Sequence, residues 1–274
     1  MAAVGTALPS ASGRSGLRGT LISEYTKIRS VRSTYWTLLA LLAVSIGLGA
    51  VISAATAGHW NQMSPSDRAT FDPTQTSLAG MFFLGQLVIV VLGALVLTSE
   101  YSTGMIRTSL TAMPRRSVVY AAKALVFAGT MLVVTLVTTF ITFFLGQALL
   151  ASTHDQATIS GTGVMRAVIG SAIYVTLCGL FAFALGSLLR HTAGAITAGL
   201  GILFVLPIIA HVLPSSWYHE VERWLPSSAG TAISTTVGPV DSHLFSGWGE
   251  MIVFAAYVAI LLLAGATLFR KRDA

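Results

Sequence analysis

Six long apolar runs constrain this chain more than any other feature. We expect spans at Thr37–Ala57, Leu78–Thr98, Val118–Leu150, Val164–Leu189, Ala193–Leu213 and Glu250–Phe269. Each offers the roughly 20 residues that a helix needs to cross about 30 Å of hydrocarbon. Only 9% of the residues are charged, against about 25% in a typical soluble domain. The sequence therefore predicts an all-α integral membrane protein, with residues 17–274 forming one transmembrane domain.

The segment before the first span divides into a tail and an amphipathic stretch. Residues 1–16 are rich in Ala, Ser and Gly and lack the apolar region of a secretion signal, so we expect a disordered cytoplasmic tail. In Leu17–Ser33, apolar residues recur at helical spacing, while Glu24, Lys27 and Arg29 occupy other positions. This pattern predicts a helix lying on the inner leaflet. The alternative is a basic flank that only sets orientation.

The basic residues predict the topology. With the N-terminus inside, 13 of the 16 lysines and arginines lie on the cytoplasmic side, and the exceptions are Arg68, Arg166 and Arg223. The positive-inside rule therefore favours cytoplasmic N- and C-termini. The net charge of +6 is divided among short groups that flank apolar runs, so it indicates topology and not nucleic-acid binding.

The loop between the fifth and sixth runs contains a further helical pattern. Trp217, Val221 and Trp224 recur at helical spacing. We expect a short helix at the outer interface, or one that re-enters the membrane. The alternative is an aromatic belt without a helix.

Several features of an autonomous pump or enzyme are missing from the sequence. No acid lies in the middle of a span, because Glu100 and Glu250 are at ends, and Lys123 is close enough to an end to snorkel. Ion-coupled transporters normally need ionisable groups at membrane depth. No G-x-x-x-x-G-K-[ST] phosphate loop, hydrolase motif or metal-ligand spacing occurs either. We therefore expect no catalytic activity, metal or cofactor in this chain, and any energy must come from another polypeptide.

The segment Glu100–Arg116 is expected to connect spans two and three on the cytoplasmic face. Glu100 lies at the C-terminal end of a helix, where the helix dipole disfavours a negative charge, so it needs a cationic partner. The candidate partners are Arg107, Arg115 and Lys123. Gly104 allows a turn, and Pro114 ends the short helix between them. The alternative is an ordinary basic loop.

Three segments carry a resemblance to a known family: EYTKIRSVRSTYW, EYSTGMIRTSLTAMPRRSVVYAAKALV and LPSSWYHEVERWLPSSAGTAI. With the six spans, they resemble the membrane subunit of type-2 ATP-binding-cassette (ABC) exporters, the actinobacterial members in particular. The resemblance covers nearly the whole chain after residue 17. Its most specific part is the connector with its Pro-Arg-Arg end.

The resemblance implies a permease in a bacterial plasma membrane. It implies a second permease copy, as a homodimer or heterodimer, and two copies of a nucleotide-binding subunit that holds ATP and Mg. Glu24, Lys27 and Arg29 would belong to the family's connecting helix. The ATPase-coupling candidates are Glu100, Gly104, Met105, Arg107, Pro114 and Arg115.

A threonine face on the third span and a small-residue face on the first span each allow two interpretations. A stripe of threonines in the third span could line the pathway, or its hydroxyls could bond helix carbonyls; it comprises Thr135, Thr138, Thr139 and Thr142. Small residues on the first span could pack against a second permease or within one subunit; they are Ala43, Gly47, Ala50 and Ala54. Pro207 could kink the fifth span.

The function that the resemblance implies is export of a hydrophobic or amphipathic substrate, such as a drug, an antibiotic or a lipid, as in multidrug efflux. The main alternative is an ATP-independent channel or membrane scaffold. A lipid-modifying enzyme would have to use Asp241, His243 and Glu250, which form no known motif.

Overall fold

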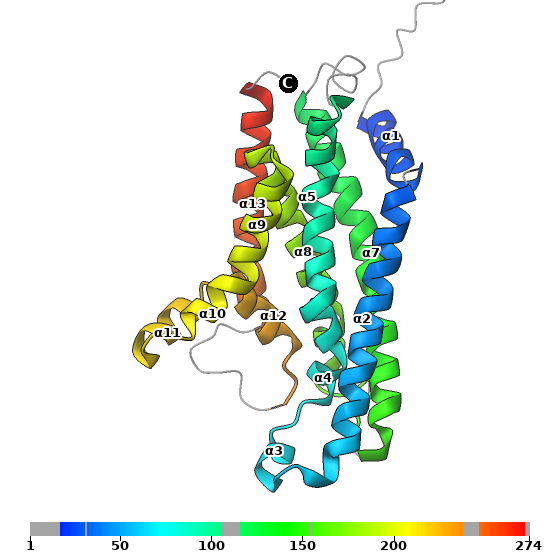
Figure 1. Ribbon diagram of the computed structural model, residues 1–274, viewed down its shortest axis with the longest axis vertical. Helices are drawn as coiled ribbons and strands as arrows, with labels where there is room; N and C mark the ends of the chain where they lie inside the picture. The colour runs from blue at the N-terminus through cyan, green and yellow to red at the C-terminus, as the bar shows by residue number, and fades with distance from the viewer. Residues whose placement is uncertain (1–16, 31, 106–115, 154, 238–246, 272–274) are drawn as a thin grey trace, which may run out of the picture.

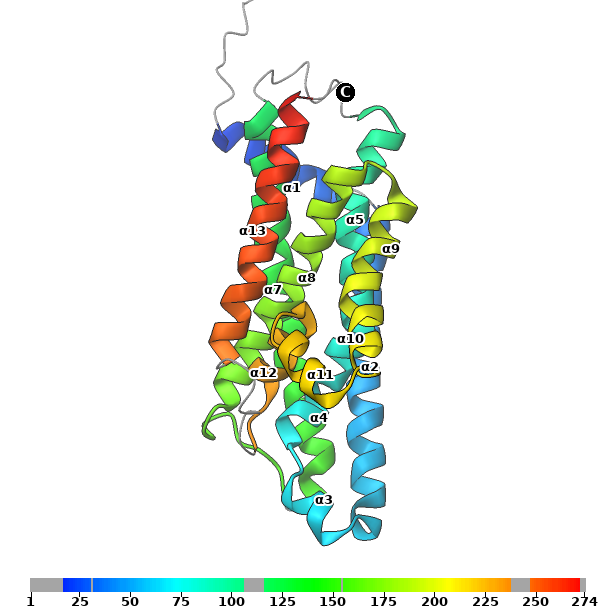
Figure 2. The same cartoon turned by 90° about the vertical axis from the view of Figure 1, so that its left-hand side faces the viewer.

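The chain forms an upright bundle of helices in the computed structural model, which describes residues 17–30, 32–105, 116–153, 155–237 and 247–271 (Figures 1 and 2). Helix α1 (Leu17–Ser30) and the C-terminal end of α13 (Gly247–Lys271) lie at one end, called here the α1 end. Helix α3 (Pro65–Ala69) lies at the other, the α3 end. The predicted tail, residues 1–16, lies outside the described residues.

Within the described ranges, six helical segments are long and apolar enough to cross a membrane, which confirms the multi-pass prediction. Four are single helices: α2 (Arg32–His59), α7 (Arg116–Leu150), α8 (Val164–Leu189) and α13. The second comprises α4 (Pro73–Gly80), η2 (Met81–Gly85) and α5 (Gln86–Ser102). The fifth comprises α9 (Thr192–Leu200), η4 (Gly201–Val205) and α10 (Leu206–Ala210), and the sixth is α13.

Short helices connect the spans. They are η1 (Trp60–Gln62), α3, η3 (Ala151–Thr153), α11 (Ser215–Glu222) and α12 (Pro226–Ser234). Helix α11 follows span five and projects from the bundle (Figure 1). Trp217 and Trp224 are exposed, whereas Leu225 is buried at the start of α12.

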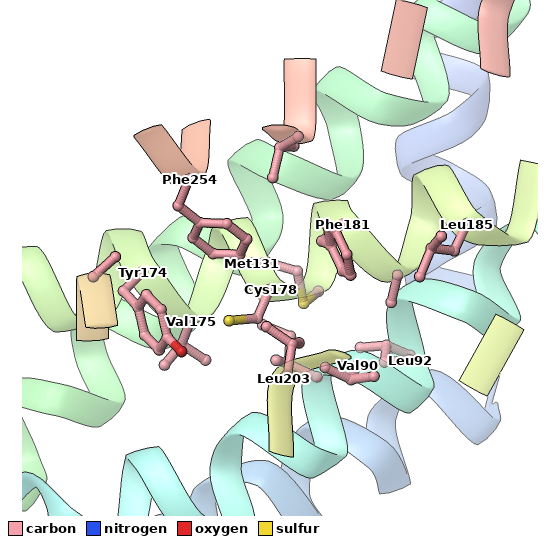
Figure 3. Close-up of a cluster of buried hydrophobic side chains, with 14 of the residues drawn as sticks. Val90, Leu92, Met131, Tyr174, Val175, Cys178, Phe181, Leu185, Leu203 and Phe254 are labelled. Carbon is pink, nitrogen blue, oxygen red and sulfur yellow. The ribbon is translucent and has the colours of Figure 1, made fainter. Parts of the chain in front are cut away.

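Helix α8 lies at the centre of the bundle, where its side chains form the core with α5, α7 and α13. Cys178 is buried in this core beside Phe181 and Val175 (Figure 3). Helices α5 and α8 approach backbone to backbone, because a Cβ on Gly93 would lie 2.1 Å from the carbonyl oxygen of Gly179. Small residues permit this close packing, which is typical of membrane helices.

The two faces of α2 differ in what they contact. Leu41, Ser45 and Gly49 are buried against the bundle, and a Cβ on Gly80 of α4 would lie 2.4 Å from the Gly49 nitrogen. On the other face, Ala43, Gly47 and Ala54 are exposed and Ala50 is half-buried. Among the described residues, most of the small-residue face therefore makes no packing contact, which corrects the alternative of packing within one subunit.

Candidate functional site

Four charged side chains meet near the α1 end and form what we call the ion cluster: Glu24, Lys27, Glu100 and Lys123. Lys123 of α7 donates a hydrogen bond to Glu24 Oε2 of α1 at 2.6 Å and another to Glu100 Oε1 at the end of α5. Lys27 Nζ lies 2.9 Å from Glu24 Oε1 and 3.6 Å from Glu100 Oε1. The cluster therefore joins α1 to the α1-end termini of spans two and three.

The cluster confirms one expectation and corrects another. Three cationic residues were expected as possible partners for Glu100. Of these, Lys123 forms an ion pair with Glu100 in the described part of the chain. Lys123 does not snorkel to solvent, since its side chain is only 2% exposed and lies between two carboxylates. Buried charges are tolerated where they are paired in this way. Glu100 also keeps one buried oxygen, Oε2, without a hydrogen-bond partner in the described part of the chain.

Lys27 is the most exposed member of the cluster, and its environment favours the charged form. Burial lowers the pKa of Lys27, but the hydrogen bond to Glu24 and the charges of Glu100 and Glu24 outweigh this effect. The net result is a pKa raised above the ordinary value of 10.5. Lys27 is therefore charged at neutral pH.

Helix α1 presents its polar face to the bundle. Thr20 and Glu24 are buried, whereas Ile22 and Tyr25 on the other side are 57% and 52% exposed. The sequence predicted that the charged residues lie away from the apolar face of this helix. In the structure, Glu24 pairs with Lys27 of the same helix and with Lys123 of α7. Arg29 remains exposed. A helix anchored through charges and open on its apolar side is suited to lying on a bilayer surface.

The connector is described only in part. Gly104 follows α5 with a φ of +70°, a left-handed conformation that glycine adopts readily, so the predicted turn is confirmed. Met105 is exposed and lines a cavity of about 320 Å³ together with Glu100 and Lys27. The other coupling candidates, Arg107, Pro114 and Arg115, lie outside the described residues.

The threonine stripe of α7 is buried and bonded to helix carbonyls. The hydroxyls of Thr138, Thr139 and Thr142 each donate to the carbonyl four residues earlier, at 2.7–2.9 Å. Thr135 instead reaches α8, at 3.1 Å from the Ala172 oxygen. The structure thus favours packing over pathway lining for these residues.

A larger cavity of about 610 Å³ lies between spans one, two, four and five and helix α12. We call it the α12 cavity. Its wall includes Phe82 and Phe83 from η2 and Leu203 and Phe204 from η4. Gln86 and Tyr174 contribute polar atoms, and Gln86 Nε2 donates to the Tyr174 hydroxyl at 3.1 Å.

The segments η2 and η4 are wide π-helical turns on both sides of this cavity. In η2 the Gln86 N–H bonds the Met81 oxygen, and in η4 the Leu206 N–H bonds the Gly201 oxygen. Pro207, which has no N–H, is the second residue after η4, so the fifth span is irregular where a kink was expected. Single π-helical turns occur frequently at functional sites.

One carboxylate holds together two elements that line the α12 cavity. Asp72 Oδ1 accepts from the backbone N–H groups of Thr74 and Gln75 at 3.0 Å each, which caps α4. Its Oδ2 accepts from the backbone N–H groups of Thr236, and of Val237 at 3.0 Å, just beyond α12. We call this arrangement the Asp72 clamp.

A family model described as "Protein of unknown function (DUF2705)" matches residues 60–274, most of the chain. The chain belongs to the DUF2705 family. No curated protein matches it. The DUF2705 match includes spans two to six, both wide turns and the Asp72 clamp, whereas the Glu24 and Lys27 side of the ion cluster precedes it.

Sequence reasoning missed three polar features of this chain. The Asp72 clamp has a local signal, because Asp followed by Pro is a typical start of a helix. Gln86 is a polar residue within an apolar run, which also marks it. The pairing of Glu24 with Lys123 has no sequence signal, since it joins residues that are 99 positions apart.

Proposed function

We propose that this chain is the permease subunit of an ABC exporter in a bacterial plasma membrane. Two permease copies form the path for a hydrophobic or amphipathic substrate, and two separate nucleotide-binding subunits supply the energy of ATP hydrolysis. In this proposal the α1 end is cytoplasmic, in agreement with the positive-inside count.

The observation that carries the proposal is the ion cluster. It joins α1 and the ends of spans two and three through charged pairs, and one of its members, Glu100, is the first residue of the connector Glu100–Arg116. A push on the connector or on α1 would therefore move these elements together. An ordinary loop and a loose basic flank would not need a buried cluster at their junction.

The α12 cavity supports the same proposal. Alternating access requires spans that can change shape around a central space, and the wide turns η2 and η4 lie in spans two and five at this cavity. The exposed small-residue face of α2 supports a second copy, because a Cβ on Gly47 would meet nothing within 4 Å.

Copurification tests the proposal. The chain is expressed with the proteins encoded beside it, isolated in mild detergent and assayed for ATPase activity. Arg107→Glu inverts a charge on the connector. Arg223→Glu makes the same change at the C-terminal end of α11, where the partner of Arg223, Glu220, is exposed and the pair contributes little.

We expect a stoichiometric ATPase that dissociates or loses activity with Arg107→Glu and is unchanged with Arg223→Glu. Equal effects of the two variants would remove the connector from the mechanism. If no nucleotide-binding protein accompanies an intact membrane complex, the energy source is missing, and the ATP-independent channel or scaffold becomes the better hypothesis.

A further inference from the structure

The α12 cavity has the chemistry of a ligand site. Its volume of about 610 Å³ lies within the range of about 300–1,000 Å³ that is common for small-molecule pockets. No charged side chain is among the described residues that line it. Aromatic and aliphatic side chains form much of the wall, with a few hydroxyl and carboxamide groups. Such a wall favours a neutral ligand, because a buried charge without a partner is costly.

Gln86 is the polar group that distinguishes this cavity. Its side chain is buried, and its Nε2 donates to Tyr174, but its Oε1 accepts no hydrogen bond from the described residues. This oxygen is not fully enclosed by protein, and Gln86 lines the cavity, so it can accept a hydrogen bond from a molecule in the cavity.

The chain contains a contrasting buried glutamine. Gln147 uses both ends of its carboxamide within the protein: Nε2 donates to the Pro73 oxygen at 2.9 Å, and Oε1 accepts from the Ala157 N–H at 2.7 Å. Gln147 is therefore a structural residue. Gln86 is oriented by Tyr174 and keeps an acceptor available for a molecule in the cavity.

The rim of the cavity indicates where a ligand would enter. Phe83 of η2 and Ile208 of α10 line the cavity, and their side chains are 61% and 66% exposed. Both lie within spans, so this exposed apolar rim faces the hydrocarbon of a bilayer.

We propose that the α12 cavity binds a neutral amphipathic molecule from the bilayer, with a hydroxyl or N–H group donating to Gln86 Oε1. The apolar part of the molecule contacts Phe82, Phe83 and Phe204. Gln86 is thus the residue that selects for a hydrogen-bond donor, and Tyr174 positions it. The site does not require the chain to be a permease, since a channel or scaffold could hold the same ligand.

Photolabelling of the purified chain, without any ATPase, tests the site. The probe is a monoacylglycerol with a diazirine in its acyl chain, and the control probe is the fatty-acid methyl ester of the same length, which has no hydroxyl. We expect saturable labelling of peptides that contain Phe82, Phe83 or Phe204, with competition by unlabelled monoacylglycerol.

Two variants and a matched control make the test specific. Gln86→Leu should weaken the monoacylglycerol by about tenfold, the value of one hydrogen bond, and leave the methyl ester unchanged. Ala79→Leu narrows the cavity and should weaken both probes, whereas Ala148→Leu, on an exposed position of α7, should weaken neither. Protection of buried Cys178 from thiol reagents reports that each variant is folded.

Unchanged affinity of folded Gln86→Leu for the monoacylglycerol would overturn the role of Gln86. Labelling that is unsaturable, or that Ala79→Leu leaves intact, would overturn the site itself. Neither result bears on the copurification experiment, so the two proposals fail independently.

Discussion

Replacement of Lys123 by Met would remove the central cation of the ion cluster while keeping most of the side-chain volume. Among the described residues, Glu24 and Glu100 would then share only Lys27, which lies 2.9 Å from the first and 3.6 Å from the second. Removing one partner of a buried ion pair costs about 3–5 kcal/mol. At about 2–4 °C per kcal/mol, the melting temperature should fall by about 6–20 °C.

The chain contains its own reporter for this measurement. Cys178 is its one cysteine and is buried in the core (Figure 3), so a maleimide dye that fluoresces on reaction with a thiol follows unfolding during heating. The isolated chain in detergent is used, so that no other protein contributes thiols. Arg29→Met is the matched control, because Arg29 is exposed on α1 and its loss should change the stability by less than about 0.5 kcal/mol.

A double variant separates the loss of charge pairing from the loss of packing. Lys123→Met with Glu100→Gln removes one buried cation and one buried anion and leaves the Glu24–Lys27 pair at 2.9 Å. The double variant should therefore melt at a higher temperature than Lys123→Met alone. The single variant Glu100→Gln is measured as well. The reasoning would be refuted if Lys123→Met were as stable as the wild type, or if the destabilisation of the double variant equalled the sum of those of Lys123→Met and Glu100→Gln.

Three further predictions use the same thermal assay. Asp72→Ala removes the cap of α4 and the clamp beyond α12 and should cost about 2–4 kcal/mol, with Asp72→Asn less damaging because Asn also caps helices. Gly93→Ala should cost about 1–3 kcal/mol by pressing on the Gly179 backbone, whereas Gly129→Ala, with nothing within 4 Å, should stabilise α7. Because the pKa of Lys27 is raised on folding, its contribution should persist at neutral pH and disappear as the pH rises above 10.5, and Lys27→Met should abolish that loss.

Much of the architecture is predictable from the chain because hydrocarbon imposes strict rules on a backbone. Every span must be a helix of sufficient length, and the boundaries of the fourth, Val164–Leu189, agree fully with the apolar run. The second span begins at Pro73 instead of Leu78, because Asp72 caps a polar first turn that hydropathy alone does not include.

The candidate sites are less predictable, because contacts between distant residues decide them. The sequence marks Glu100 as needing a cation, but only the packing of α1 on α7 brings Glu24 to Lys123. Similarly, the threonine stripe is polar in the sequence, yet its hydroxyls donate hydrogen bonds to backbone carbonyls of α7 and α8. Local pattern cannot distinguish a hydroxyl that faces a cavity from one that bonds its own helix.

The sequence by itself therefore predicted six helices long and apolar enough to span a membrane, the positions of most of them and which charge needed a partner. The tertiary structure alone decided which partner it received, that the small-residue face of α2 points outward, and that Gln86 borders a cavity. The physical reason is that span formation depends on the local cost of exposing polar groups to lipid, whereas these features depend on which helix faces meet.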